Sequence, residues 1–431
     1  MGFESIFVLI LVFAVLLAIR VPIAFSIGLA TLVTILISVD VLPALTTIAQ
    51  RMATGLDSFT LLAIPFFILA GQLMNQGGIA KKLIDFAKVL VGTLPGGLAY
   101  VNVISAMLFG AISGSAVAAA SAIGGIMDPQ MKKEGYEPEF GAAVNITSST
   151  TGLLIPPSNV LIVYSLASGG VSIAALFLAG YLPGILVGLG LMLTSGYIAF
   201  RKKYKVAERV TLKTALFRFL DAIPSLFLIF IVIGGIIAGV FTATEAAAVA
   251  VLYALILSFF YKEINFSKIP TILFDSAKTT AIVMLLIATS VAMSWVLSFE
   301  NIPQAISEGL LNMVESGVAI LLIMNLILLI VGAFIDITPA ILIFTPIFLP
   351  VAVQLGIDPI HFGIIIVFNL TVGLCTPPVG TVLFVGCSVA DVPITKVIKP
   401  LIPMFVVMIV SLLLITFVPE ISLFLPRLFG Y

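Results

Sequence analysis

Long apolar runs separated by short polar segments fill the whole chain. A run of about 20 apolar residues is long enough to cross a lipid bilayer as an α-helix. The runs lie at 4–19, 23–39, 59–75, 94–128, 139–168, 172–200, 219–241, 244–261, 279–298, 317–353, 360–390 and 400–425. The pattern therefore predicts an all-α protein that crosses a membrane many times.

Two of the runs, 94–128 and 317–353, are too long for a single crossing. Polar, helix-breaking residues interrupt each near its middle, at 113–115 (Ser-Gly-Ser) and at 336–339 (Asp-Ile-Thr-Pro). Non-helical backbone at membrane depth is tolerated only where protein or a water-filled cavity covers it. We therefore interpret each run as a re-entrant hairpin of two short helices that enter and leave on the same side.

An amphipathic segment precedes each predicted hairpin. Residues 79–92 and 302–315 place apolar residues at helical spacing, with charged residues on the opposite face. Such helices lie in the plane of the membrane interface. We expect two arm helices of this kind, the first basic and internal, the second acidic and external.

The composition removes several classes of function. Of the 431 residues, 61% are hydrophobic and 9% are charged, whereas a soluble domain carries about 25% charged residues. These values exclude a soluble enzyme, a nucleic-acid-binding protein and a disordered chain. The two cysteines and one histidine provide neither a disulfide framework nor the usual ligands of haem or a metal cluster.

The basic residues predict an orientation. If each hairpin returns to its own side and every other run crosses once, 18 of the 20 Lys and Arg residues share one face, and only Arg51 and Arg427 lie on the other. Basic residues concentrate on the cytoplasmic side of membrane proteins. We therefore expect both chain termini to lie outside, the first hairpin to open inward and the second to open outward.

The sequence repeats itself at an offset of 221 residues. Between positions 126 and 157, nine of 32 residues are identical to the residue 221 positions later, and four of the nine are prolines, which fix backbone shape. Each half contains five crossings and one hairpin, so the second half should be inverted relative to the first, as in many secondary transporters. The predicted boundaries are a first repeat at 1–200 (scaffold helices 1–75, arm 79–92, hairpin 94–128, broken helix 139–168), a basic cytoplasmic linker at 201–218 and a second repeat at 219–431 (scaffold helices 219–298, arm 302–315, hairpin 317–353, broken helix 360–390).

A helix that a double proline must break follows each hairpin. The first broken stretch, 145–159, holds five consecutive hydroxyl residues, and the second, 369–381, holds fewer polar residues of the same kinds. Proline lacks an amide hydrogen, so carbonyl groups about one turn earlier lose their donors and become available to a small cation. Ser and Thr also serve as simple helix–helix contacts and Pro-Pro as a kink. The coincidence of duplicated breaks with polar hairpin tips favours a binding site.

Neither broken stretch contains an acid, a lysine or a histidine, which a proton relay needs, so the neutral oxygens favour sodium. Asp336 is either a helix cap or a cation ligand. Glu245 is either a functional acid or a group satisfied by a neighbouring helix, and His361 is a helix-end or interface residue rather than a ligand. Helix N-termini at Ser115 and near Pro339 would attract a substrate carboxylate.

These features together resemble the large membrane subunit of tripartite ATP-independent periplasmic (TRAP) transporters, and the resemblance covers essentially the whole chain. Its most specific parts are the Phe109–Ser115 tip, Gly152–Pro157, Thr242–Ala246 and Gly373–Pro378. The resemblance implies a transporter rather than an enzyme. It implies import of an organic acid, of the sialic acid or C4-dicarboxylate type, with sodium and by an elevator mechanism in which a transport domain moves against a scaffold.

The same resemblance implies partners and a location. A soluble periplasmic binding protein would deliver the substrate, and a small four-helix membrane subunit, encoded separately because this chain begins with the twelve-run unit, would support the scaffold in the bacterial inner membrane. No organic cofactor and no nucleic acid are expected. A stand-alone sodium/dicarboxylate symporter is the alternative, and an intramembrane lipid-modifying enzyme is a remote one.

Individual roles follow from the resemblance together with the polar pattern. The expected sodium ligands are Ser113, Gly114, Ser115, Asn145, Thr147, Ser148, Ser149, Thr150, Asp336, Thr338, Thr371 and Thr376. The expected substrate-binding residues are Ser115, Pro156, Pro157, Ser158, Asn159, Pro377, Pro378 and Thr381.

Overall fold

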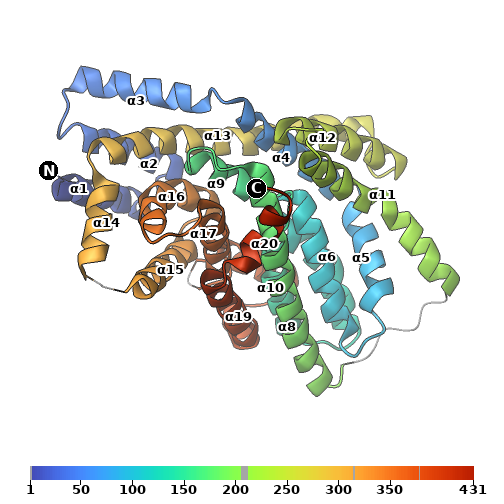
Figure 1. Cartoon of the computed structure of the whole chain (residues 1–431). Helices are drawn as coiled ribbons and strands as arrows, with labels where there is room; N and C mark the ends of the chain where they lie inside the picture. Colours follow the sequence, from blue (N-terminus) through green and yellow to red (C-terminus); the bar gives the residue numbers. More distant parts are fainter. Residues whose placement is uncertain (1, 205–211, 314–315, 378) are drawn as a thin grey trace.

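The computed structural model describes residues 2–204, 212–313, 316–377 and 379–431, and in these parts the chain forms helices without a β-strand (Figure 1). The helices of the first half are α1 (Gly2–Ala18), α2 (Ile23–Ile35), α3 (Val41–Leu56), η1 (Phe59–Leu62), α4 (Ala63–Gln76), α5 (Ile79–Val91), α6 (Gly97–Ser113), α7 (Ala116–Lys133), α8 (Pro138–Thr151), α9 (Asn159–Ala167) and α10 (Ile173–Arg201). The helices of the second half are α11 (Leu212–Ile237), α12 (Ala243–Phe260), η2 (Phe266–Lys268), α13 (Ile269–Phe299), α14 (Ile302–Met313), α15 (Gly317–Phe334), α16 (Ile337–Gln354), α17 (Pro359–Gly373), α18 (Thr381–Ala390), α19 (Ile394–Phe417) and α20 (Glu420–Leu428).

Eight helical segments within the described residues are long and apolar enough to cross a membrane. They are Phe59–Gln76, Ile173–Arg201, Lys213–Ile237, Ala243–Phe260, Phe266–Phe299, Gly317–Phe334, Ile337–Gln354 and Ile394–Phe417. Both helices of the second predicted hairpin, α15 and α16, are among them. Their length alone would permit a full crossing, so the re-entrant arrangement stays a prediction based on the sequence.

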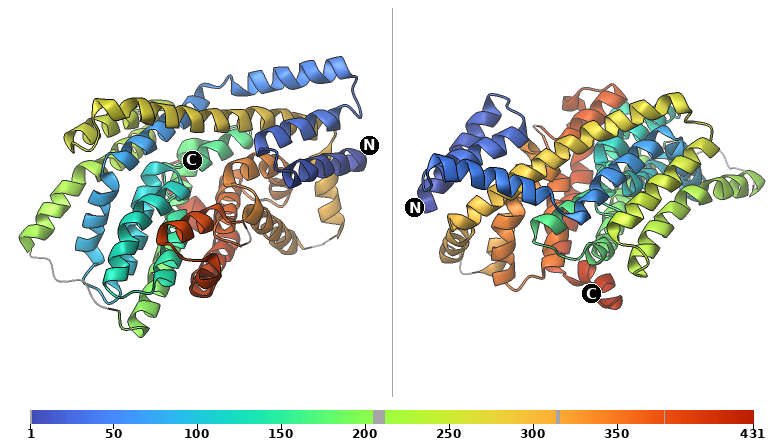
Figure 2. Two further views of the ribbon diagram at one scale, coloured as in Figure 1. Left: turned by 180° about the vertical axis from the view of Figure 1, so that it is seen from behind. Right: turned by 90° about the horizontal axis from the view of Figure 1, so that it is seen from above.

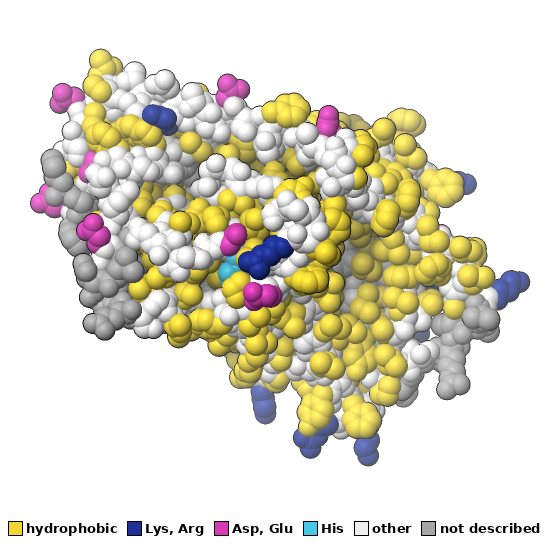
Figure 3. Space-filling view, viewed as in Figure 1, with side chains coloured by type: hydrophobic (Ala, Val, Ile, Leu, Met, Phe, Trp, Pro, Cys, Tyr) yellow, Lys and Arg dark blue, Asp and Glu magenta, His cyan; other side chains and the backbone are white. Residues whose placement is uncertain are grey.

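Apolar side chains cover much of the face shown in Figure 3, as expected for helices that face lipid. Lys and Arg side chains gather mainly at the lower and right-hand end of the view, and Asp and Glu mainly at the upper and left-hand end. On this face the charges are thus separated along one direction. The predicted orientation requires such a separation.

The helices form two groups that meet along α13. This helix packs against α2, α3 and α4 and also against α16. It lies in the upper part of the molecule in Figure 1 and crosses the molecule in the view from above in Figure 2. The second group surrounds α8, which contacts α6, α7, α18 and α19. Small residues permit the closest approaches: a Cβ added at Gly55 of α3 would lie 2.7 Å from Val291 Cγ1 of α13.

The helix boundaries follow the sequence offset of 221. α7 begins at Ala116 and α16 at Ile337, and α8 begins at Pro138 and α17 at Pro359, each 221 positions apart. The contacts repeat as well, but they cross between the halves. α7 packs on α18 of the second half, and α16 packs on α9 of the first half.

The structure differs from the sequence expectation at two elements. α3 lies between two predicted spans where no helix was expected, and it packs on α13 through a narrow apolar face that includes Ala44 and Ile48. The run at 400–425 is divided into α19 and α20 because Val418 precedes Pro419 and adopts φ −122°, and a residue before proline avoids the helical conformation. The predicted linker 201–218 and arm 302–315 extend over residues 205–211 and 314–315, which lie outside the described parts.

Candidate functional site

The first hairpin tip is built around a left-handed glycine. α6 ends at Ser113, Gly114 has a φ of 63°, and the Ser115 hydroxyl caps α7 by accepting a hydrogen bond from the Ala118 backbone N–H at 3.2 Å. A side chain at position 114 would be strained. A Cβ there would also lie 2.8 Å from Asn159 Nδ2. The glycine therefore allows the tip to lie directly against the start of α9.

The first helix break lies beside this tip. Residues 152–158 are not helical, and the peptide bond between Pro156 and Pro157 is cis. A Cβ on Gly152 would lie 2.3 Å from the Cα of Gly110. The break and α6 are therefore in backbone-to-backbone contact, which only glycine at both positions permits.

The second tip and break repeat this arrangement. Asp336 occupies the cap position of α16 without a side-chain capping bond. A Cβ on Gly373, at the end of α17, would lie 2.5 Å from the Cα of Gly332 on α15. The Gly380 N–H, just before α18, donates a hydrogen bond to the Ala333 carbonyl at 3.2 Å. Each break is thus fixed against the hairpin of its own half.

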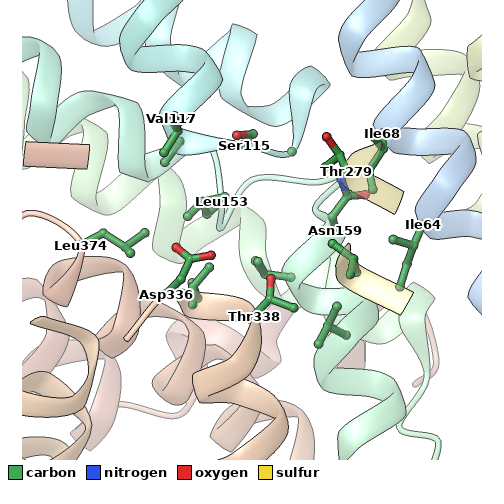
Figure 4. A pocket seen from close by; sticks show the side chains of 16 residues that line it. Ile64, Ile68, Ser115, Val117, Leu153, Asn159, Thr279, Asp336, Thr338 and Leu374 are labelled. Atoms are coloured by element: carbon green, nitrogen blue, oxygen red, sulfur yellow. The ribbon is translucent and has the colours of Figure 1, made fainter. Parts of the chain in front are cut away.

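A cavity of about 210 Å³ lies between the two tips (Figure 4). Gly114 and Ser115 line it from the first tip, Asp336 and Thr338 from the second, and Asn159 from the start of α9. Asp336 lies inside the molecule, but its side chain is accessible because the carboxylate faces the cavity. Five of the predicted site residues therefore meet in one place.

Helices α4 and α13 close the remaining side of the cavity. Ile64 and Ile68 come from α4, and Thr279 and Val283 come from α13. In Figure 4 Thr279 and Asn159 line the same side of the cavity as it is drawn. Sequence reasoning did not identify Thr279, because a single hydroxyl near the start of a span carries no signal without the tertiary contact.

The hydroxyl residues of the broken helices lie outside the cavity lining. Those that donate a hydrogen bond to a carbonyl three or four residues earlier on their own helix are Thr147, Ser148, Ser149, Thr150, Thr151, Thr371 and Thr376. A hydroxyl that donates its proton keeps its lone pairs. These oxygens therefore remain able to contact a cation, although they do not converge on the cavity in this structure.

Two buried polar pairs join the hairpins to the broken helices. Ser148 donates to Asn102 Oδ1 of α6 at 3.3 Å, and Asn369 Nδ2 donates to Asn325 Oδ1 of α15 at 2.7 Å. The Oδ1 atoms of Asn145 and Asn369 are buried without a hydrogen-bond partner in the described structure. Sequence reasoning missed Asn102 and Asn325, although an amide within an apolar helix is a usable signal.

The other predicted site residues occupy varied positions. Pro156, Pro157 and Ser158 are buried, and the Ser158 hydroxyl donates to the Leu153 carbonyl within the first break. Thr381, at the first position of α18, lies near the Asp336 carboxylate. Pro377 is exposed, and Pro378 lies outside the described residues.

Two titratable residues considered from the sequence have local partners. Glu245 forms a capping box with Thr242, whose backbone N–H donates to Glu245 Oε2 at 2.8 Å. Its partner is therefore on its own helix rather than on a neighbouring one. His361 is buried in the first turn of α17, with Nε2 3.3 Å from the Thr416 carbonyl oxygen. Neither residue lines the cavity.

Comparison with known proteins places the chain among transporters. The family model described as "Tripartite ATP-independent periplasmic transporter, DctM component" matches residues 10–421. The chain is 59% identical to the uncharacterized protein YgiK of Salmonella typhimurium, with all of both chains covered. It is 40% identical to the C4-dicarboxylate TRAP transporter large permease protein DctM of Rhodobacter capsulatus, covering 98% of this chain and 99% of that one. It is 38% identical to the sialic acid TRAP transporter large permease protein SiaM of Vibrio cholerae, covering 89% and 90%.

Solved structures share the fold at much lower sequence identity. The YdaH transporter of Alcanivorax borkumensis superposes with a TM-score of 0.66 at 14% identity, covering 91% of each chain. MtrF of Neisseria gonorrhoeae superposes with a TM-score of 0.64 at 12% identity, covering 88% of this chain and 85% of that one. Family and helices together identify a multi-pass membrane transporter and not an enzyme. The chain belongs to the DctM family, the large permease component of tripartite ATP-independent periplasmic transporters.

Proposed function

We propose that this permease imports an organic acid together with sodium. The cavity between the two hairpin tips carries the proposal, because it combines two helix N-termini with one carboxylate. α7 and α16 are each 18 residues long and begin at the cavity. A helix N-terminus presents unpaired N–H groups and partial positive charge, which favour an anion. An organic carboxylate between the tips would receive both.

The carboxylate of Asp336 explains why the import would need a cation. It lines the same cavity, so an anionic substrate would meet a like charge in surroundings of low dielectric constant. Binding a cation beside Asp336 would cancel this repulsion. Sodium suits the other oxygens near the tips and breaks, which are neutral hydroxyl, amide and carbonyl groups. The unpartnered Oδ1 atoms of Asn145 and Asn369 fit such a role.

The partners and the movement form part of the same proposal. The relatives named as C4-dicarboxylate, sialic acid and 2,3-diketo-L-gulonate TRAP permeases point to a carboxylate substrate. A relative from Oleidesulfovibrio alaskensis named as the isethionate permease DctMQ is longer, and this chain covers 65% of it. We infer that a periplasmic binding protein delivers the substrate and that a small membrane subunit supports the scaffold. The transport domain (hairpins and broken helices) would move past α13 as an elevator in the bacterial inner membrane, with both chain termini in the periplasm.

Reconstituted uptake tests the proposal. The permease, its small membrane subunit and the binding protein would be placed in proteoliposomes with radiolabelled succinate or N-acetylneuraminate. We expect uptake only under an inward sodium gradient. Uptake that follows a pH gradient and ignores sodium would contradict the coupling, and uptake by the permease alone would support the stand-alone symporter instead.

A pair of matched variants tests the contribution of the hydroxyl oxygens. Thr371 donates to the Val367 carbonyl at 2.7 Å, and Thr194 on α10 donates to the Gly190 carbonyl at 2.9 Å. Thr371→Ala should raise the half-saturating sodium concentration about tenfold, the loss of one contact of about 1.5 kcal/mol to a charged group. Thr194→Ala, which removes the same local bond away from the breaks, should leave it unchanged. Equal sodium dependence in the two variants would exclude Thr371 as a ligand.

A further inference from the structure

A second cavity, of about 420 Å³, lies apart from the central one. It occupies the junction where α3 and α13 face the end of α9 and the middle of α16. Arg51 and Thr54 line it from α3, and Ser290, Ser294 and Ser298 line it from α13. In the orientation proposed above, this junction is on the outer side of the membrane. We call it the outer cavity.

Arg51 brings an uncompensated positive charge to the outer cavity. Its guanidinium carbon lies 5.0 Å from the centre of the Trp295 ring on α13, and its side chain is exposed. In the parts of the chain that the structure describes, no carboxylate forms an ion pair with it. A cation–π contact positions a guanidinium without neutralising it. The five N–H donors of Arg51 therefore stay available for a bidentate contact with a carboxylate.

Ser290 supplies a second, independent sign of a ligand. The residue is 1% exposed, and its hydroxyl has no hydrogen-bond partner among the described residues. An orphaned buried hydroxyl is uncommon, because leaving it unsatisfied costs about 1–3 kcal/mol. Ser294 and Ser298 follow on the same face of α13, since residues four apart on a helix lie one above the other. All three serines line the same cavity as Arg51.

Helix α13 lines both the central cavity and the outer cavity. Thr279 of α13 lines the central cavity and Ser290 lines the outer one. Eleven residues of α-helix span about 16 Å. The lining of the outer cavity comes from α3 and α13, which belong to the predicted scaffold, and from α9 and α16, which belong to the predicted broken helix and hairpin. It therefore bridges the predicted scaffold and the predicted transport domain.

We propose that the outer cavity is a second binding site for a small organic carboxylate, held by Arg51 with Ser290 and Ser294. The inference rests on the proposed function, since the outer cavity would bind an incoming anion before that anion reaches the central cavity. The acidic outer face otherwise repels such an anion: Asp40 and Asp57, on either side of α3, are both exposed. Arg51 and its hydroxyl partners then provide a local attractive position within a repulsive surface.

The chain offers a built-in reporter, because Trp295 is its single tryptophan. The full-length permease would be placed in phosphatidylcholine nanodiscs without sodium, and tryptophan fluorescence would be followed during titration with succinate and with N-acetylneuraminate. We expect a saturable change with at least one of them. Arg51→Gln should raise the half-saturating concentration about tenfold or more, the usual loss for a charge-assisted contact, and Ser290→Ala about threefold.

Arg427→Gln is the matched control. Arg427 is the other basic residue expected on the outer side, and it lies 3.9 Å from Glu420 rather than at the outer cavity. Its variant should titrate like the native protein. Identical titrations of the native protein and Arg51→Gln would overturn the proposal. A response that requires sodium, or that disappears in Asp336→Asn, would also overturn it, because Trp295 would then be reporting the central site.

Two further comparisons separate the alternatives. Phosphatidylglycerol added to the nanodisc tests whether a lipid headgroup is the anion. If this lipid abolishes the fluorescence change during the carboxylate titration, and if it shifts the starting fluorescence of the native protein but not that of Arg51→Gln, the site binds lipid and the proposal is wrong. The transport proposal and the outer-site proposal can be contradicted independently. If sodium does not drive uptake but Trp295 still responds to the carboxylate, only the transport proposal is wrong. If uptake is normal but Trp295 does not respond, only the outer-site proposal is wrong.

Discussion

Replacing Asp336 with asparagine would test how the permease couples an anion to sodium. The substitution removes the negative charge and keeps the size of the side chain. Asp336 makes no side-chain capping bond to α16, so the helix should survive the change. The altered quantity is the electrostatic cost of placing a substrate carboxylate in the central cavity.

The size of the cavity sets the magnitude. A sphere of 210 Å³ is about 7 Å across, and two unit charges at that separation repel by about 2.4 kcal/mol for an effective dielectric constant of about 20. This energy corresponds to about 50-fold in a dissociation constant. Native substrate affinity should therefore be about 50-fold weaker in potassium than in sodium, and the ratio should fall close to one in Asp336→Asn.

Calorimetric titration in sodium chloride and in potassium chloride, at equal ionic strength, measures this ratio directly. Asp40→Asn is the control, because Asp40 occupies the cap position of α3 and also makes no side-chain capping bond. The control should keep the native ratio. If Asp336→Asn kept it too, the charge of Asp336 would not couple the ions. If affinity fell equally in both salts, Asp336 would contact the substrate rather than sodium.

Two further predictions concern stability. Gly152→Ala should lower the free energy of unfolding by about 1–3 kcal/mol, because the new methyl group would meet the backbone of Gly110; Gly125→Ala, with open space around it, should be neutral or stabilising, and circular dichroism during heating distinguishes the two. Neutralising either partner of the partly exposed Lys82–Asp221 ion pair, which joins α5 to α11, should cost about 0.2–1 kcal/mol. A double-mutant cycle with strictly additive costs would contradict that pairing.

Most of the helices could be predicted from the sequence because their boundaries are set by local chemistry. The Ser-Gly-Ser tip ends a helix through a left-handed glycine and a serine cap, and α5 begins and ends within one residue of the predicted arm at 79–92. α3 was not predicted, because much of its surface is exposed and its apolar face is narrow. Its helical structure depends on packing against α13, which no local pattern records.

The candidate site was predicted less completely. Gly114, Ser115 and Asp336 are polar or flexible residues at interruptions of apolar runs, and this pattern can be recognised from the sequence alone. Thr279 and Asn102 act through contacts between helices distant in sequence, which require the tertiary arrangement. The hydroxyl residues of α8 were expected to converge on a cation, whereas here their protons are donated to the helix backbone.

The crossed pairing of the halves has a consequence for the ancestry of this fold. α7 is covered by a helix of the second half, and α16 by a helix of the first. A protein made of one half alone would contain one helix of each of these two pairs, and the packing face of each helix would be uncovered. A single-copy precursor would therefore need a second identical chain, so that the hairpin of each subunit packs on the other subunit. Duplication and fusion of such a chain would place both exchanged contacts within one polypeptide.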